Sequence, residues 1–174
     1  MPAGRWVLRA LTTVVAAALV LGSMLAGYSR QISPEEAATA VKPIADFYEK
    51  LRAGGDEAAA ALELFSLGLA SVAMCNIPVA GPAIAVYLGY SSGTLSRALE
   101  VHQAVLAENT LYSSVSSVLQ LAALVLATAE GLYLSVVMLG RKESWEPLET
   151  AAIALLQASL VALASILEAA SIFG

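Results

Sequence analysis

The sequence has few charged residues. Asp, Glu, Lys and Arg make up only 13% of its 174 residues, whereas soluble domains carry about 25%. It also contains one histidine and one cysteine. The scarcity of charge excludes a disordered tail, and a net charge of −5 gives no electrostatic reason to bind nucleic acid. One cysteine excludes an internal disulfide, and one histidine argues against a histidine metal site or a catalytic triad within one chain.

The chain is instead rich in apolar residues, which account for 59% of its composition. So few polar side chains cannot cover a solvated surface, and the surplus apolar surface must therefore face lipid. We expect an integral membrane protein whose main partner is the lipid bilayer. Residues 1–174 are expected to form a single all-α membrane domain that passes several times through a cell membrane.

Long apolar runs indicate about five spanning helices, because about 20 apolar residues cross a bilayer. The expected spans are residues 6–28, 58–77, 83–98, 118–139 and 150–173. The fourth apolar segment already starts at Leu111. The first run could instead be a cleaved signal peptide. We expect it to be retained, because it is longer than the usual apolar core of such a peptide.

Residues 29–57 form the longest polar stretch and are expected to be an extramembrane, amphipathic helical segment. Ser33, Pro34 and Glu36 predict a helix start with a capping box, and Gly54 with Gly55 predicts its end.

Apolar residues recur along this helix at helical spacing, and Pro43 is expected to kink or split it. The apolar residues are Val41, Ile44, Tyr48 and Leu51. Such a stripe can dock a partner or lie on the membrane, or it can fold onto the protein's own bundle. We favour folding onto the bundle.

Prolines and glycines punctuate the middle of the chain. Pro78 and Pro82 flank Gly81, and this pattern cannot continue a helix, so it predicts the tip of a helical hairpin. Small residues four apart favour close helix packing. They are Gly89 and Gly93 in the third span, and Ser23 and Gly27 in the first. Their partner is a helix of the same chain or of a second copy, which leaves a homo-oligomer open.

Glu130 is the most informative polar residue, since it falls near the middle of the fourth span. A carboxylate at such depth needs a donor, a water-filled cavity or a proton. The candidate donors are Asn76, Tyr87, Arg97, Gln120, Tyr133 and Gln157. Glu130 is either a proton or cation site or an interhelical hydrogen bond that holds the bundle together, and we favour the structural role.

The known signatures of soluble enzymes are missing. The sequence has no phosphate-binding loop, no dinucleotide glycine fingerprint and no Gly-x-Ser-x-Gly elbow. Its two aspartates, Asp46 and Asp56, both fall in the polar stretch, so they cannot form an intramembrane catalytic pair. We therefore expect a protein that is not an enzyme and that has no cofactor, no metal and no catalytic residue.

Several short motifs resemble the stage II sporulation protein M family, especially its short archaeal members. Residues 76–82 (Asn-Ile-Pro-Val-Ala-Gly-Pro) are similar to the family's hairpin motif, and residues 90–93 (Tyr-Ser-Ser-Gly) to a stretch one helix later. Residues 120–131 resemble a third motif, which ends in Glu-Gly. The resemblance covers about residues 62–140. Family positions carry over to Asn76, Pro78, Gly81, Pro82, Gly93, Glu130 and Gly131.

The resemblance has one departure. The family usually carries a histidine and a glutamate one helical turn apart, where this chain has Ser116 and Gln120. A role that depends on the charge of that pair would be lost here. The family implies a polytopic protein of about five spans, whose bacterial namesake works in an engulfment complex with a wall-degrading enzyme. We do not transfer the spore-specific role.

Two functions follow as expectations. The first is a non-enzymatic scaffold or organiser of a membrane complex, with other membrane proteins or further copies as partners. The second is a transporter or channel subunit with Glu130 as an intramembrane carboxylate. Basic residues lie directly against the spans at Arg5, Arg9, Arg141 and Lys142, which favours a cytoplasmic N-terminus, although the total counts on the two sides are similar.

Overall fold

A computed structural model describes residues 2–102, 115–140 and 146–174 of the chain. All regular elements within these ranges are α-helices, as expected. In chain order they are α1 (Pro2–Tyr28), α2 (Pro34–Gly54), α3 (Glu57–Cys75), α4 (Ala80–Val101), α5 (Val115–Gly140) and α6 (Pro147–Phe173). The expected start of the fourth apolar segment at Leu111, and the basic residues Arg141 and Lys142, lie outside the described residues.

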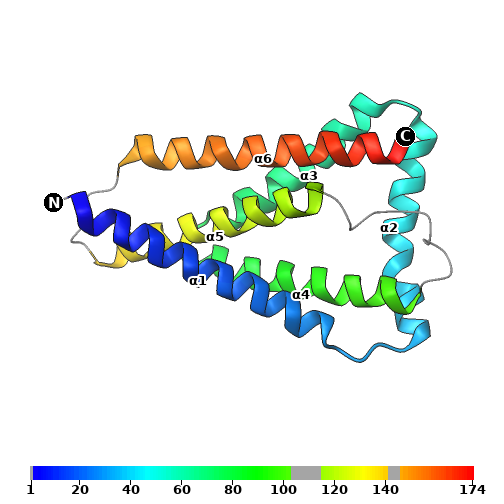
Figure 1. Cartoon of the computed structure of the whole chain (residues 1–174), viewed down its shortest axis with the longest axis horizontal. Helices are drawn as coiled ribbons and strands as arrows, with labels where there is room; N and C mark the ends of the chain where they lie inside the picture. Colours follow the sequence, from blue (N-terminus) through cyan, green and yellow to red (C-terminus); the bar gives the residue numbers. More distant parts are fainter. Residues whose placement is uncertain (1, 103–114, 141–145) are drawn as a thin grey trace.

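The helices form a bundle with two side-by-side pairs (Figure 1). α1 packs against α4, and α3 packs against α6, while α5 runs between the pairs and contacts both. α2 lies across one end of the bundle, where α4 ends and α3 begins. In the described part of the chain the backbones of α1 and α6 stay apart, and α5 packs between them against both.

Four helices are long and apolar enough to cross a membrane, which is consistent with a multi-pass membrane protein. They are α1 over Gly4–Tyr28 and the whole of α3, α5 and α6. By length and composition the count is thus four, one fewer than the expected five. α4 is not among them, because tyrosine, serine, threonine and glycine fill much of its second half and lower its hydropathy. α4 nevertheless runs lengthwise beside α1 (Figure 1).

The polar stretch forms α2, and its start is as expected. The Ser33 side chain accepts a hydrogen bond from the Glu36 N–H, the Glu36 side chain accepts one from the Ser33 N–H, and Gly55 ends the helix at φ +65°. The helix continues through Pro43, so the expected split does not occur. Pro43 and Thr39 are both exposed, and solvent can therefore satisfy the Thr39 carbonyl that the proline leaves unbonded.

The apolar stripe of α2 packs onto the bundle, which was the favoured alternative. Val41 is buried with Ala98 of α4, and Leu51 is buried with Ala60 of α3 and Ile172 of α6. α2 therefore bridges the two helix pairs at one end of the bundle.

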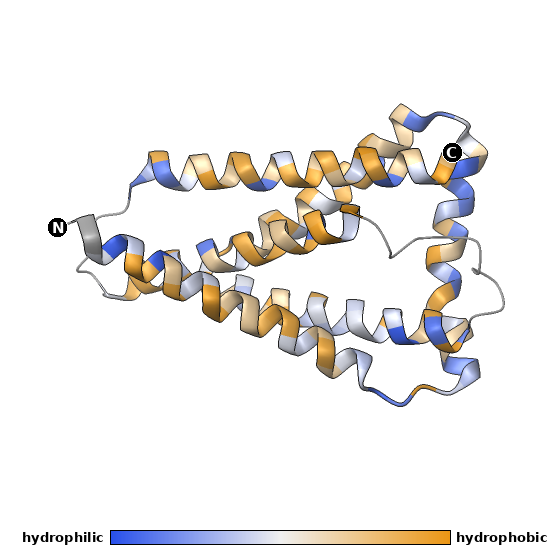
Figure 2. Ribbon diagram, viewed as in Figure 1, coloured by the Kyte–Doolittle hydropathy of each residue, from blue (hydrophilic) through white to orange (hydrophobic). Residues whose placement is uncertain are grey.

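Small residues dominate the centre of the bundle, which brings the helices close together. The central cluster consists of Val20, Val72, Cys75, Ala85, Ala123, Ala127 and Val161. Cys75 is a buried free thiol. Many large apolar side chains are exposed instead, and apolar residues recur along the whole length of α1 and α6 (Figure 2). Only 22% of the most apolar stretch of α1, α3 and α6 is buried, against 39% for α5.

Candidate functional site

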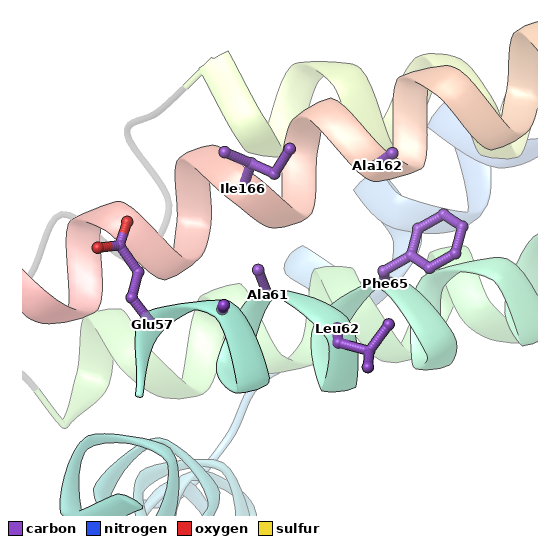
Figure 3. A pocket seen from close by; sticks show the side chains of 7 residues that line it. Glu57, Ala61, Leu62, Phe65, Ala162 and Ile166 are labelled. Atoms are coloured by element: carbon purple, nitrogen blue, oxygen red, sulfur yellow. The ribbon is translucent and has the colours of Figure 1, made fainter. Parts of the chain in front are cut away.

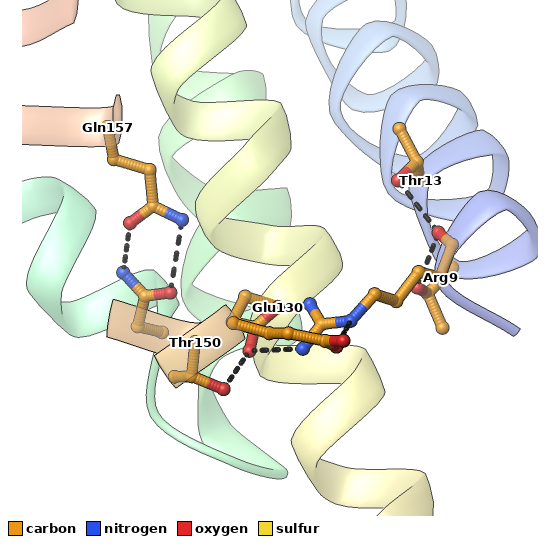
Figure 4. A network of polar contacts seen from close by, with 8 residues as sticks. Arg9, Thr13, Glu130, Thr150 and Gln157 are labelled. Carbon is orange, nitrogen blue, oxygen red and sulfur yellow. Dashed lines mark hydrogen bonds and ion pairs between the residues drawn. The ribbon is translucent and has the colours of Figure 1, made fainter. Parts of the chain in front are cut away.

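Three helices bring polar side chains together near the end of the bundle where the chain begins (Figure 4). Arg9 of α1 forms a bidentate ion pair with Glu130 of α5, in which the longer contact, between Nη2 and Oε1, measures 3.5 Å. Thr150 of α6 donates a hydrogen bond of 2.7 Å to Glu130 Oε1. Arg9 is 8% exposed and Glu130 is 3% exposed. This buried ion pair is the candidate functional site.

Two further groups surround the Arg9 guanidinium. Glu149 Oε2 lies 3.4 Å from Arg9 Nε, and the guanidinium carbon lies 4.0 Å from the centre of the Tyr133 ring. An isolated carboxylate is very costly to bury, so Arg9 is the group that compensates the charge of Glu130. The Tyr133 hydroxyl is buried and has no hydrogen-bond partner among the described residues, so Tyr133 contributes through its ring face.

A second ion pair extends the cluster toward the surface. Arg5 of α1 pairs with Glu146, which immediately precedes α6, and their side chains are 20% and 46% exposed. Two arginines therefore face three carboxylates. The Arg9 carbonyl also accepts hydrogen bonds from the hydroxyls of Thr12 and Thr13, at 3.0 and 2.8 Å.

Sequence reasoning missed Arg9 as the partner of Glu130. Of the six expected donors, only Tyr133 lies in this cluster, and its ring contacts Arg9 rather than the carboxylate. Arg9 was assigned to the flank of the first span, as a residue that sets topology. One signal in the sequence could have identified it. Arg9 precedes the next charged residue, Arg30, by twenty-one residues, and Glu149 precedes Glu168 by nineteen, so the uncharged stretches of α1 and α6 are of similar length and Arg9 and Glu149 each begin one.

The length of these uncharged stretches is close to that of the hydrocarbon core of a bilayer. Nineteen residues correspond to roughly 28 Å of α-helix, close to the thickness of about 30 Å of the hydrocarbon core. Measured along α1 and α6, the Arg9–Glu130 pair thus lies near one boundary of the uncharged zone. Along α5, by contrast, Glu130 lies well inside the apolar helix, because ten residues separate it from the helix end at Gly140.

A cavity of about 260 Å³ adjoins the ion pair between α1, α5 and α6. Its polar lining comes from Arg9, Glu130 and the two threonines Thr12 and Thr13, and Trp6 lies at its α1 wall. This volume is enough for several water molecules, each of which takes up about 30 Å³ in the liquid.

The hairpin between α3 and α4 is held by a pair of amides. Asn76 Nδ2 donates to Gln157 Oε1 at 2.7 Å, and Gln157 Nε2 returns a bond to Asn76 Oδ1 at 3.4 Å (Figure 4). Gln157, on α6, is 1% exposed. Both amides were expected donors to Glu130, but each satisfies the other instead.

Glycines let the hairpin close against its neighbours. A Cβ atom on Gly81 would lie 2.0 Å from the Cys75 carbonyl oxygen, and one on Gly131 would lie 2.5 Å from the same oxygen. The Pro78 carbonyl accepts the Ala80 N–H, and Pro82 occupies the first turn of α4, where a helix needs no N–H. The structure therefore gathers Pro78, Gly81, Pro82 and Gly131 at one place.

Val79, at the hairpin tip, has a φ of +68°, which is strained for a β-branched residue. Its N–H donates to Ser135 Oγ of α5 at 2.7 Å, and that hydroxyl donates to the Gly131 carbonyl at 2.6 Å. These bonds tie the strained tip to α5.

The four small residues singled out for helix packing lie at the contact between α1 and α4. A Cβ atom on Gly93 would meet the Met24 carbonyl oxygen at 1.9 Å, and one on Gly89 would meet Ser23 Oγ at 2.3 Å. A Cβ atom on Gly27 would meet the Tyr90 carbonyl oxygen at 2.1 Å. Of the two partners left open by the sequence, the structure uses a helix of the same chain.

Gln120 lies apart from Glu130. Its Nε2 donates to Glu168 Oε2 of α6 at 2.7 Å, and the Tyr48 hydroxyl of α2 donates to the other oxygen of that carboxylate. Gln120 thus belongs to a second polar contact, at the end of the bundle that α2 crosses.

No group of three or more His, Cys, Asp or Glu in the described ranges is placed to hold a metal ion. Comparison with known proteins gives no match: no protein-family model, no curated protein and no solved structure is similar to this chain.

Proposed function

We propose that this chain is a multi-pass membrane protein that organises a membrane complex as a non-enzymatic scaffold. The observation that carries the proposal is the small buried share of its outer helices, 22% for each of α1, α3 and α6. Their remaining faces are apolar and available to lipid or to other membrane proteins. A bundle in which most of each outer helix is exposed is suited to lateral assembly with other membrane proteins.

The internal polar groups support a structural role. Arg9 pairs with Glu130, Asn76 pairs with Gln157, and Val79 bonds to Ser135. Each contact joins two different helices, and each satisfies groups that would otherwise be costly at this depth. In this role the polar side chains hold the helices in position and take no part in a chemical reaction.

The resemblance to the stage II sporulation protein M family supports the same proposal. The residues that carry it, Asn76, Gly81, Gly93, Glu130 and Gly131, all contact another helix, so they act in the architecture of the bundle. A family whose bacterial namesake works by assembly in the membrane fits a scaffold.

The partner surface is not the stripe of α2. Val41 and Leu51 are covered by the bundle itself, and Tyr48 is engaged by Glu168. The outward faces of α1 and α6 remain, where Val14 is 67% and Leu155 is 69% exposed. We therefore place the partner, either another membrane protein or a second copy, against these faces.

The finer topology is part of the proposal. α4 falls short of a span by composition, but it carries the chain back along the bundle beside α1, and we propose that it crosses the membrane with it. The end with Arg5 and Arg9 is then cytoplasmic, and α2 is on the far side. Labelling of single cysteines placed at Lys50 and at Gly4 in intact cells, in a Cys75→Ser background, tests this orientation.

Photo-cross-linking in native membranes tests the scaffold. A photoreactive amino acid at position 14 or 155 is expected to give one discrete protein adduct. The same group at Val161, which is 1% exposed, is expected to give none between chains. Adducts with lipid alone at both exposed positions would refute the scaffold, since a stable complex must cover some lateral face.

A transporter or channel subunit is the second candidate, and the cavity beside the ion pair favours it. The cavity of about 260 Å³ gives a small ion or water access to Arg9 and Glu130. Liposomes with purified protein test it directly. A selective cation or proton flux that Glu130→Gln removes, while Glu146→Gln retains it, would support transport. Absence of any flux across ion types would reject it.

A further inference from the structure

An apolar groove runs along the α3–α6 pair, close to the end that α2 crosses (Figure 3). It holds about 560 Å³, within the range of about 300–1,000 Å³ of small-molecule sites. Alanines at positions 58, 61 and 162 give it depth. Glu57 and Phe65 of α3 lie at its two ends, and Ile166 of α6 forms the opposite wall.

The groove faces outward from two helices that are apolar enough to span a membrane. Leu62 and Ile166, on its rim, are 67% and 56% exposed. The medium around such faces is the hydrocarbon of the bilayer. The acyl chain of a lipid is therefore available to fill the apolar part of the groove.

The polar end of the groove is negatively charged. Glu57 is the one ionisable residue among the described residues that line it, and in the described part of the chain its carboxylate has no ion pair or side-chain hydrogen bond. Asp56 next to it accepts hydrogen bonds from the N–H groups of Ala58 and Ala59. The nearby Arg52 of α2 donates to the Ile172 carbonyl at 3.3 Å. The mouth therefore offers carboxylate oxygens to a cation.

We propose that this groove binds a phospholipid with a primary ammonium head group. One acyl chain lies between α3 and α6, and the ammonium pairs with Glu57 at the level where the chain enters the membrane. A lipid such as phosphatidylglycerol carries the same phosphate but has no ammonium to pair with Glu57, so its anionic charge stays uncompensated beside the carboxylates. Glu57 also favours the start of α3 through the helix dipole, but that effect does not depend on the lipid. The proposal depends on membrane insertion and does not depend on the scaffold role.

Competition between two lipids tests the proposal. The protein is reconstituted in nanodiscs made of equal parts of phosphatidylethanolamine and phosphatidylglycerol, and the lipids that stay bound are counted by native mass spectrometry. We expect phosphatidylethanolamine to be enriched about twofold to fivefold, as for a partly exposed ion pair. Glu57→Gln is expected to abolish the enrichment, and Glu49→Gln, an exposed carboxylate of α2, is expected to preserve it.

Ala58→Phe adds a second readout. It fills the groove from an exposed position and is expected to reduce bound lipid of either kind while leaving the fold intact. Equal retention of both lipids, or an enrichment that survives Glu57→Gln, would overturn the proposal. So would photo-cross-linking from position 62 to a second copy, because the groove would then be covered by protein. The scaffold role is tested separately, by the protein adducts formed from positions 14 and 155.

Discussion

Removal of Arg9 is the sharpest perturbation of the buried ion pair. Arg9→Met keeps an unbranched side chain of similar length but leaves Glu130, 3% exposed, without its cation. Breaking a buried pair from one side costs about 3–5 kcal/mol. The remaining Thr150 bond offsets about 1 kcal/mol of that penalty. We therefore expect Arg9→Met to lower the free energy of unfolding by about 2–4 kcal/mol.

The double variant Arg9→Met with Glu130→Leu removes both charges together. It is expected to return to within about 1 kcal/mol of the wild type, because a buried pair replaced by apolar residues is often neutral. Reversible unfolding in bicelles, followed by steric trapping, gives these energies. Arg5→Met is the matched control. Its pair with Glu146 is partly exposed, so the loss should stay below about 1 kcal/mol. If Arg9→Met cost no more than this control, or the double variant were weaker than Arg9→Met, the assigned role of the pair would be wrong.

Three further predictions concern packing, strain and pH. Gly93→Ala should separate α1 from α4 and lower the melting temperature, whereas Gly22→Ala, which meets nothing within 4 Å, should leave it unchanged; equal effects would contradict the packing model. Val79→Gly should relieve the positive φ and raise the free energy of unfolding by about 1 kcal/mol, and a loss in the same unfolding assay would argue against strain. Glu100, beyond the end of the expected third span, accepts hydrogen bonds from Arg97 and from the Tyr28 hydroxyl, and these lower its pKa. Its stabilising effect is thus complete above its ordinary pKa of 4.5 and fades as the pH falls through the lowered pKa, so the melting temperatures of the wild type and Glu100→Gln should converge in acid. A difference that stayed constant with pH would count against this contact.

The local structure followed well from the sequence. Long apolar runs gave the four candidate spans to within a few residues, because only helices satisfy all backbone groups in lipid. The capping box at Ser33 and the glycine stop of α2 involve neighbouring residues alone, so their signals lie in a few letters. The hairpin tip between Pro78 and Pro82 was equally local.

The number of spans was harder to predict. Residues 83–98 were expected to span as one of the apolar runs, but the polar second half of α4 gives the helix too low a hydropathy. Gly89 and Gly93 let α1 pack closely against α4, so the burial of α4 depends on a helix more than sixty residues away in the chain. Composition alone cannot report such a contact.

The sequence by itself determined that the chain is helical, where most helices begin and end, and that its surface is too apolar for water. These properties depend on residues close together in the chain and on their affinity for water or lipid. Only the tertiary structure decided which polar groups meet. Glu130 pairs with Arg9 from 121 residues away, and Asn76 with Gln157 from 81. A buried charge selects its partner by the faces that packed helices present to each other, and those faces exist only once the bundle has formed.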